Sequence, residues 1–289
     1  MKQIIISLRP QQWIKNLFIF LPLVFGKMLY AYPYNVNVVF AFILFCAISS
    51  TAYLLNDLYD LKSDLMHPIK KHRPIASGRV SAKLALFFIA ILGCSAVALS
   101  FMLNFKFGII AITYLAFSVL YTAVLKYYVI IDVFSIAAFF LLRILAGSVI
   151  AEVYLSHWIV VMIALLALFL GFNKRRQEIQ LLKGDALNCR SVLAKYSVHF
   201  IDQMVAITTA SLVVAYMLYT IDSRTVHQFG SKDLLFSVPF VYYGIFRYLY
   251  IIYKSKDGDP TQVLLSDRPM QLAILFWLIV SIAVIYFSL

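Results

Sequence analysis

Charged residues are scarce in this sequence. Lys, Arg, Asp and Glu make up 13% of its 289 residues, against 63% hydrophobic residues and a mean hydropathy of +0.89. A soluble domain carries roughly a quarter of its residues as charged side chains, so this composition excludes an ordinary water-soluble protein. The apolar stretches are instead long enough to cross a bilayer, which takes about 20 residues each.

Cysteine and histidine are also few. The three cysteines, Cys46, Cys94 and Cys189, form no CxxC pair, and a free cysteine usually acts as a small buried apolar residue. Among the five histidines, His67 and His72 flank a basic loop, and ordinary loop residues are the simpler interpretation of both. No convincing His or Cys nucleophile is therefore predicted.

The apolar stretches predict nine membrane-spanning helices, and so an all-α, polytopic membrane helical bundle. Their approximate ranges are 17–34, 36–55, 84–104, 107–125, 129–150, 157–173, 200–222, 234–253 and 270–289. The N-terminus lacks the short apolar core and small-residue cleavage site of a removed signal peptide, so we expect the first span to be retained. Residues 1–289 are predicted to form one transmembrane domain.

Positive charges follow the alternation of these spans. With a cytoplasmic N-terminus, 19 of the 25 Lys and Arg residues fall on the cytoplasmic side and four on the far side, as the positive-inside rule expects. This bias explains the net charge of +12, which is therefore no argument for a nucleic-acid partner. Ten of the 13 acidic residues also fall on the cytoplasmic side, although the rule does not govern them. We expect the cytoplasmic loops 57–83, 174–199 and 254–269 to carry the active site.

The densest acidic run, NDLYDLKSD, follows the second predicted span. On a continued helix, at about 100° per residue, Asn56, Asp57, Asp60 and Asp64 share one arc. Carboxylates this close raise one another's pKa, and Mg²⁺ removes that conflict while bridging carboxylates to substrate phosphates. A solvated helix end is the alternative, but ionisable groups at a membrane are usually functional. We predict that all four residues bind Mg²⁺ and that the three aspartates are catalytic.

Cationic residues follow the acidic run. The stretch HPIKKHRPIASGR contains Lys70, Lys71, Arg73 and Arg79. Cations beside a metal site suit a substrate that carries more phosphate than the metal can neutralise. Positive-inside anchoring is the alternative, and it is the simpler interpretation for Lys71 and Arg79.

A second basic stretch, FNKRRQE, follows the sixth predicted span. Lys174 and Glu178 are spaced i, i+4, so an intrahelical pair is the simplest interpretation of these two. Arg175 and Arg176 then remain as candidate anion ligands. Arg143 lies inside the fifth predicted span, where a charge is costly, and both a buried structural role and a substrate role stay open for it.

These motifs together resemble the UbiA superfamily of intramembrane prenyltransferases. NDxxDxxxD at the end of the second helix, followed by an RP-containing loop, is similar to the superfamily. Five stretches resemble its decaprenyl-phosphate phosphoribosyltransferase-like branch: LRPQQWIKN (8–16), NDLYDLKSDLMHPIKKHRPIASG (56–78), FLLRILAGS (140–148), FNKRRQE (172–178) and DPTQVLLSDRP (259–269). The second DxxxD motif of typical members is replaced here by NKRRQE, which argues against a second metal site and a prenyl diphosphate donor.

The resemblance implies Mg²⁺-dependent transfer of 5-phosphoribose from phosphoribosyl pyrophosphate to a polyprenyl phosphate. It places the protein in a bacterial inner membrane, in cell-envelope polysaccharide synthesis. Ten residues are expected to contact substrate: Lys15, Asn56, Lys70, Arg73, Lys126, Arg143, Lys174, Arg175, Asp267 and Arg268. No general base is required, because a phosphate is already largely ionised at neutral pH.

Two alternatives come from different classes. A UbiA-type prenyltransferase would move a prenyl group from its diphosphate to an aromatic or other polar acceptor. A transporter or lipid-binding protein is disfavoured, since transporters carry ionisable residues near mid-membrane and here these residues gather on one face. The oligomeric state stays open, with a homo-oligomer as one alternative.

Overall fold

The computed structural model describes residues 2–182, 192–254 and 260–287. Within these ranges the chain forms α-helices and short 3₁₀ helices and contains no strand. The predicted all-α class is confirmed.

Eight of the described helices are long and apolar enough to cross a membrane. Five of them are α3 (Tyr34–Tyr59), α5 (Ala82–Leu103), α7 (Ile131–Ala151), α10 (Val198–Ile221) and α14 (Arg268–Phe287). The other three are α6 (Phe105–Ala123) with 3₁₀ helix η3 (Leu125–Tyr127), α8 (His157–Leu182), and 3₁₀ helix η5 (Asp233–Ser237) with α12 (Val238–Lys254). The short helices are α1 (Lys2–Ser7), α4 (Leu61–Met66), η2 (Lys70–His72), η4 (Leu193–Lys195), α11 (Ser223–Phe229) and α13 (Pro260–Ser266). The protein is an integral membrane helical bundle.

The predicted first span, 17–34, does not form a continuous α-helix. This part of the chain contains the 3₁₀ helix η1 (Pro10–Phe20) and the short helix α2 (Leu21–Phe25). A 3₁₀ helix rises roughly 2.0 Å per residue, so η1 alone extends about 22 Å. Pro10 is the first residue of η1 and Pro22 is the second residue of α2, and neither provides a backbone N–H for a continuous ladder. The predicted count of nine helices is therefore not confirmed.

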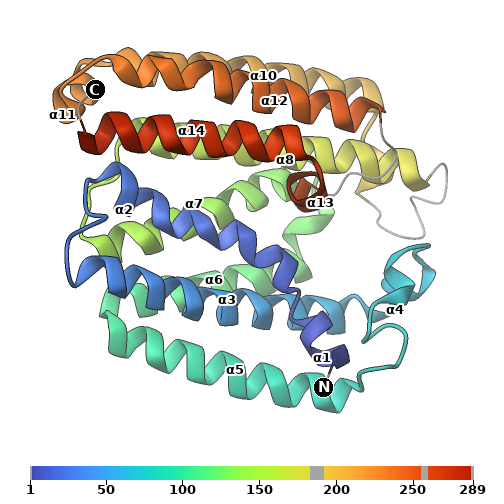
Figure 1. Ribbon diagram of the computed structural model, residues 1–289. Helices are drawn as coiled ribbons and strands as arrows, with labels where there is room; N and C mark the ends of the chain where they lie inside the picture. The colour runs from blue at the N-terminus through green and yellow to red at the C-terminus, as the bar shows by residue number, and fades with distance from the viewer. Residues whose placement is uncertain (1, 183–191, 255–259, 288–289) are drawn as a thin grey trace. The chain divides into compact units, whose positions relative to one another are not determined.

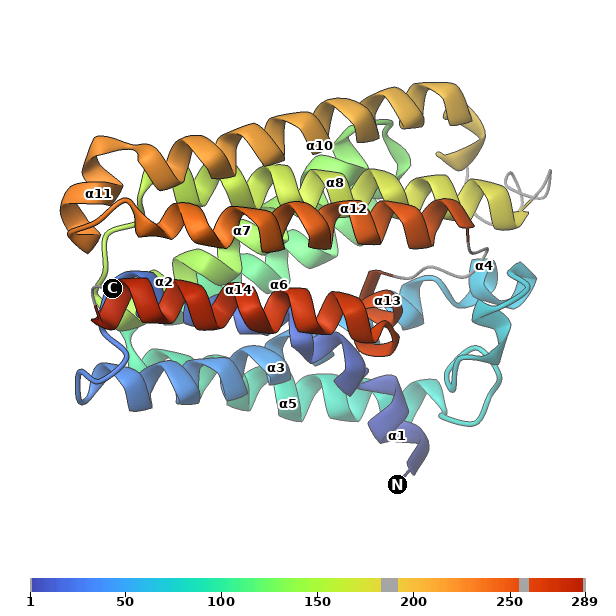
Figure 2. The ribbon, with the colours of Figure 1, turned by 45° about the horizontal axis from the view of Figure 1, so that its top comes forward.

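The described chain divides into two compact units. Unit 1 comprises the described residues of Met1–Tyr154 and Gly184–Lys195, and unit 2 those of Leu155–Lys183 and Tyr196–Leu289. In unit 1, α3 and α5 run side by side (Figures 1 and 2). That residues 1–289 form one transmembrane domain is not tested by this division and stays a prediction.

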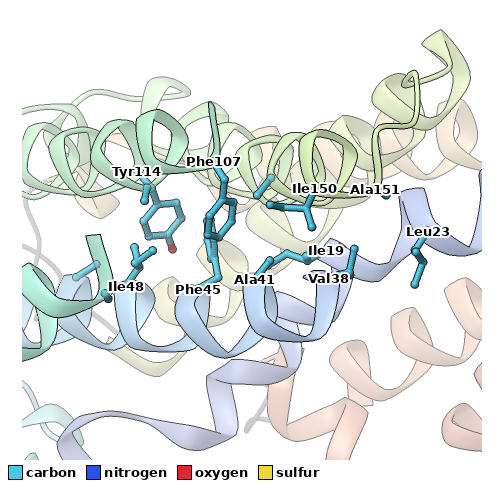
Figure 3. Close-up of a cluster of buried hydrophobic side chains, with 14 residues drawn as sticks. Ile19, Leu23, Val38, Ala41, Phe45, Ile48, Phe107, Tyr114, Ile150 and Ala151 are labelled. Atoms are coloured by element: carbon cyan, nitrogen blue, oxygen red, sulfur yellow. The ribbon is translucent and has the colours of Figure 1, made fainter. Parts of the chain in front are cut away.

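The core of unit 1 is built on one stripe of α3. Buried residues recur on this helix at intervals of three or four, which places them on one face: Val38, Ala41, Phe45, Ile48 and Ala52. Phe45 and Phe107 point toward each other from α3 and α6 (Figure 3), with ring centroids 6.4 Å apart. Tyr114 packs edge-on against Phe45 at 4.9 Å. This packing fixes the helix whose last turn carries Asn56 and Asp57, the start of the acidic run.

Segment η1 packs directly on α7 at a glycine. A Cβ on Gly147 would lie 2.0 Å from the carbonyl oxygen of Ile19, so only a residue without a side chain permits this approach. Small residues at helix contacts are typical of membrane bundles. The contact holds η1 in place, and with it the preceding Arg9.

Helix starts in both units follow local capping rules. Ser81, Asn104, Ser197 and Asp222 accept hydrogen bonds from backbone N–H groups in the first turns of α5, α6, α10 and α11. These residue types satisfy donors that have no partner within the helix. The four boundaries are therefore set by the sequence itself.

Candidate active site

The acidic run lies at the junction of two helices in unit 1. Helix α3 ends at Tyr59, and α4 begins at Leu61. The backbone bonds of an α-helix nevertheless continue: the Asp60 N–H donates to Asn56 O at 2.9 Å, and the Asp64 N–H donates to Asp60 O at 2.8 Å. The predicted continuation of helical geometry is therefore present, with a change of helix at Asp60.

Arg73 joins two of the three predicted catalytic carboxylates. Its Nη1 donates to Asp57 Oδ1 at 3.0 Å and to Asp64 Oδ2 at 2.6 Å. Both aspartates are almost fully buried, at 2% and 3% exposed, while the Arg73 side chain is 24% exposed. The RP-containing loop thus folds back onto the acidic run, as its sequence position suggested.

Arg9 is a site residue that the sequence analysis did not select. Its Nη2 donates to Asp57 Oδ1 at 2.5 Å, and its guanidinium carbon lies 5.0 Å from the centroid of the Tyr53 ring. Arg9 has φ 54° and ψ 60°, a left-handed conformation that costs a non-glycine residue of order 1 kcal/mol or more. The available signal was its place in LRPQQWIKN (8–16), one of the stretches that carry the family resemblance.

Asp60 faces a different cation from the other two aspartates. Lys126 Nζ, from η3, donates to Asp60 Oδ1 and lies 5.0 Å from the Tyr59 ring centroid. The neighbouring Asn56 accepts a hydrogen bond from Thr122 Oγ1 at 3.0 Å. Lys126 is buried, at 6% exposed. Lys126 therefore lies beside the acidic run, although 66 residues separate it from Asp60 in the sequence, and its contact with substrate stays a prediction.

The cluster of three aspartates with Arg9, Arg73 and Lys126 is balanced in charge. Each carboxylate is bound by at least one of the three cations. Burial raises the pKa of Asp64, although the neighbouring Arg73 and Lys70 act against this rise. We call this group of six residues the acidic–cationic cluster.

Two of the four predicted metal ligands, Asp57 and Asp64, share one partner in the cluster. No group of three His, Cys, Asp or Glu side chains within the described ranges is placed to hold one metal ion. Asp57 Oδ1 and Asp64 Oδ2, however, both accept from the same guanidinium nitrogen, Nη1 of Arg73. One or two carboxylates completed by substrate phosphates is the usual protein contribution to a Mg²⁺ site. These two residues therefore fit a divalent cation, with Asp60 and Asn56 next to them in sequence.

Two further predicted substrate residues belong to unit 1. Lys70, in η2, acts electrostatically on Asp64. Lys15 is partly buried in η1. Its neighbour Asn16 is fully buried and fixed by hydrogen bonds to Cys46 and Ser49.

Arg143 has contacts that favour its structural alternative. Its Nε donates to Asn16 Oδ1 at 2.8 Å, its Nη1 to Phe139 O at 2.8 Å and its Nη2 to Tyr114 OH at 2.7 Å. The guanidinium carbon also lies 5.7 Å from the Phe45 ring centroid. A charge within a membrane needs such partners. Arg143 thereby links α7 to η1 and α6, and its substrate role stays a prediction.

The basic stretch FNKRRQE lies within α8 of unit 2. Arg175 is 1% exposed, and its Nη1 donates to Glu178 Oε2, so Glu178 has a partner three residues away that the sequence analysis did not assign. Arg176 bonds Asp202 through Nε at 2.6 Å. Lys174 is half-buried on the same helix. Direct contact of Lys174 and Arg175 with substrate stays a prediction.

Asp267 and Arg268 mark the start of α14. Asp267 receives two hydrogen bonds from Arg247, at 3.2 and 2.9 Å, and one from the Met270 N–H at 2.9 Å. The hydrogen bond from Arg247 lowers the pKa of Asp267. Arg268 is exposed. Asp267 thus caps α14 and ties it to α12, which is a structural role beside the predicted substrate role.

Comparisons with known proteins agree with the predicted family. The model of the UbiA prenyltransferase family matches residues 19–286. A decaprenyl-phosphate phosphoribosyltransferase of Mycolicibacterium smegmatis is 30% identical, with 98% of this chain and 92% of the relative covered. A protein of the same name from Corynebacterium glutamicum is also 30% identical, with 97% and 86% covered.

Solved structures show the same fold. A UbiA homologue from Archaeoglobus fulgidus bound to DMAPP and Mg²⁺ has a TM-score of 0.72 at 17% identity, covering 98% of this chain and 99% of the other. The same homologue bound to GPP and Mg²⁺ has a TM-score of 0.73 at 18% identity, with the same coverage. At such low identity the likeness concerns the fold alone.

Proposed function

The chain belongs to the UbiA prenyltransferase family, and we propose that within it the protein transfers 5-phosphoribose from phosphoribosyl pyrophosphate to a polyprenyl phosphate. The curated relatives that share about 30% identity over nearly the whole chain carry the name of this activity. The observation that carries the proposal is the acidic–cationic cluster, where buried carboxylates and three cations are held together at the end of α3.

The cluster is suited to a substrate rich in phosphate. Arg9, Arg73 and Lys126 neutralise carboxylates in the protein as it stands. A diphosphate offers these cations new acceptors, and charge-assisted hydrogen bonds to phosphate are strong. We propose that the three side chains exchange their carboxylate partners for phosphate oxygens when the donor binds, which frees carboxylate oxygens at the same moment.

A divalent cation fits the oxygens that this exchange releases. Asp57 and Asp64 would hold it, with Asp60 and Asn56 as the remaining predicted ligands, and it would supply charge neutralisation for the departing pyrophosphate. Mg²⁺ is the proposed ion. It is present in the two structures of the Archaeoglobus fulgidus homologue that were solved with DMAPP and with GPP.

The proposed reaction is a displacement at the anomeric carbon of ribose. The bond from this carbon to the pyrophosphate oxygen breaks, and pyrophosphate leaves with the electron pair. A new bond forms to an oxygen of the lipid phosphate, which is already largely ionised and needs no general base. The protein supplies positioning and charge stabilisation, which agrees with the absence of a convincing His or Cys nucleophile in the sequence.

Prenyl transfer from a prenyl diphosphate is the second candidate. It is favoured by the NDxxDxxxD run, and the homologue of the same fold was solved with DMAPP and with GPP. The basic FNKRRQE stretch on α8 stands where a second acidic motif would be expected for that donor, and it supports the phosphoribosyl donor instead.

One assay separates the two candidates. Purified protein in detergent receives Mg²⁺ and polyprenyl phosphate together with labelled phosphoribosyl pyrophosphate, and label is measured after organic extraction. We expect the label to move into the lipid phase. Label that stays in the aqueous phase, together with prenyl transfer in a parallel reaction with a prenyl diphosphate and an aromatic acceptor, would favour the second candidate.

The proposed location is a bacterial inner membrane with loops 57–83, 174–199 and 254–269 on the cytoplasmic side, and the proposed pathway is cell-envelope polysaccharide synthesis. Lys71 is exposed in the first of these loops. A cysteine placed there should react with a membrane-impermeant reagent only in inverted vesicles, and labelling in intact cells would contradict this orientation.

A further inference from the structure

An apolar groove of about 430 Å³ lies between α10 and α12 in unit 2. Its walls include Ala206, Thr209, Ala210 and Val213 of α10 and Phe246 and Leu249 of α12. Small side chains at a spacing of about one turn leave the hollow on α10. The volume falls in the range of about 300–1,000 Å³ that single ligands occupy.

Both walls of the groove are membrane-spanning helices. Hydrocarbon is the surrounding solvent for such helices, so the occupant of the apolar length is expected to be a lipid chain. The apolar walls by themselves do not discriminate between one type of lipid and another. That choice depends on the polar end of the groove.

The polar end consists of Asp202, Tyr253 and Arg176. Asp202 and Tyr253 line the groove. Asp202 Oδ1 accepts from Arg176 Nε at 2.6 Å and from the Tyr253 hydroxyl at 2.9 Å. The guanidinium carbon of Arg176 lies 3.9 Å from the centroid of the Tyr253 ring. The three side chains therefore hold one another in a fixed arrangement.

In this arrangement Arg176 and Asp202 can still bind a ligand: the guanidinium can donate to an anionic group, and the carboxylate can accept from a cationic one. Arg176 is only 7% exposed, and in the described part of the chain its Nη1 and Nη2 are hydrogen-bonded to no carboxylate. Asp202 is 35% exposed at its side chain, and no described residue donates to its Oδ2. A guanidinium donates charge-assisted hydrogen bonds to phosphate oxygens, so a phosphate beside Arg176 would add to its one carboxylate bond.

We propose that this groove binds one aminophospholipid, of the phosphatidylethanolamine type. The primary ammonium of the headgroup donates to Asp202 Oδ2, the phosphate accepts from Arg176, and one acyl chain lies along α10 and α12. A headgroup with both charges matches the Asp–Arg pair, whereas a lipid that is only anionic places its charge beside Asp202. A choline headgroup has no N–H to donate to the carboxylate.

The test is a lipid titration of the purified full-length protein followed by native mass spectrometry. Phosphatidylethanolamine, phosphatidylglycerol and phosphatidylcholine of identical chains are compared. A charge-assisted hydrogen bond corresponds to about 10- to 150-fold in an equilibrium constant, so we expect phosphatidylethanolamine to bind at least about tenfold more tightly than the other two. Asp202→Asn should remove that preference.

A matched pair of variants tests the groove independently of the headgroup. Ala206→Trp fills the hollow and should abolish binding of phosphatidylethanolamine. Ile207→Trp adds the same side chain at the adjacent position of α10, which is 57% exposed and does not line the groove, and should leave binding unchanged. Thermal unfolding of both variants reports whether either has lost its fold.

Three results would overturn the proposal. These are equal retention of the three phospholipids, an equal effect of the two tryptophan variants, and tighter binding of polyprenyl phosphate than of phosphatidylethanolamine. The last result would make the groove a site for the acceptor lipid. Because none of these measurements uses turnover, failure here is distinguishable from failure of the proposed function.

Discussion

Replacing Arg73 with glutamine should change metal binding and donor binding in opposite directions. In the protein as it stands, Arg73 Nη1 bonds both Asp57 and Asp64, so a divalent cation must displace it. Arg73→Gln removes this competing charge and keeps a polar, although shorter, side chain. We therefore expect Mg²⁺ to bind more tightly to the variant in the absence of donor, and the donor to bind more weakly.

The magnitudes follow from the exposure of the pair. Breaking a fully buried ion pair costs about 3–5 kcal/mol, and an exposed pair contributes about 0–1 kcal/mol. Arg73 is 24% exposed while its partners are buried, so we expect a stability loss of about 1–3 kcal/mol, partly restored by Mg²⁺. Loss of one charge-assisted contact to phosphate, about 1.5–3 kcal/mol, should raise the apparent KM for phosphoribosyl pyrophosphate about 10- to 150-fold.

The assay combines thermal unfolding in a Mg²⁺ titration with donor-dependent kinetics. Arg79→Gln is the matched control, since Arg79 belongs to the same loop but bonds Ser77 Oγ and the His72 carbonyl rather than a carboxylate. It should leave both quantities nearly unchanged. If Arg73→Gln weakens Mg²⁺ and donor binding together, or if it leaves donor KM at the wild-type value, the proposed exchange of partners is wrong.

Three further substitutions test separate features. Asp60→Asn should reduce turnover by at least about 100-fold without loss of fold if Asp60 takes part in the proposed metal site, and near wild-type activity with Mg²⁺ would remove it from that role. Gly147→Ala should destabilise the protein strongly, because its Cβ would lie 2.0 Å from the η1 backbone. Gly244→Ala is the control: the space around its Cβ is open, so this variant should be neutral or stabilised by up to about 1 kcal/mol. Equal melting temperatures for the two variants would contradict this packing. Asp267→Asn should destabilise the protein near pH 7, where the ionised wild-type side chain is bound by Arg247. The pKa of Asp267 is lowered in the fold. The stability that the ionised side chain contributes is therefore fully present above about pH 4, the usual aspartate value, and is lost as pH falls through the lower folded pKa. A stability difference between wild type and variant that grows toward acid pH would contradict this sign.

Composition and local spacing were sufficient for the fold class and for the position of the acidic run. Long apolar stretches have few alternatives to membrane helices, and eight of the predicted spans correspond to such helices in the structure. The carboxylates were recognisable because they are close in sequence. The family also followed from contiguous motifs, and the comparisons confirm it.

The partners of those carboxylates depended on tertiary structure. Asp57 is bonded by Arg9 across 48 residues and Asp60 by Lys126 across 66, and spacing cannot rank cations that are so distant in the chain. Arg9 was missed for this reason, although it stood in a motif that had been quoted. Arg143 likewise had two open roles until its contacts with Asn16 and Tyr114 favoured the structural one.

For the first predicted span, too, the sequence indicated an apolar segment, whereas the tertiary structure decided its backbone geometry. Hydrophobicity between residues 17 and 34 is high enough for an α-helix, but periodicity is a poor guide to the difference between 3₁₀ and α geometry. The choice of η1 depends on proline positions and on the direct contact of its backbone with Gly147. Sequence alone thus determined which segments are membrane-embedded and which residue types gather at one end of α3. Packing between distant segments decided which cation neutralises which carboxylate, because ion pairs form between groups that the fold brings within a few ångströms.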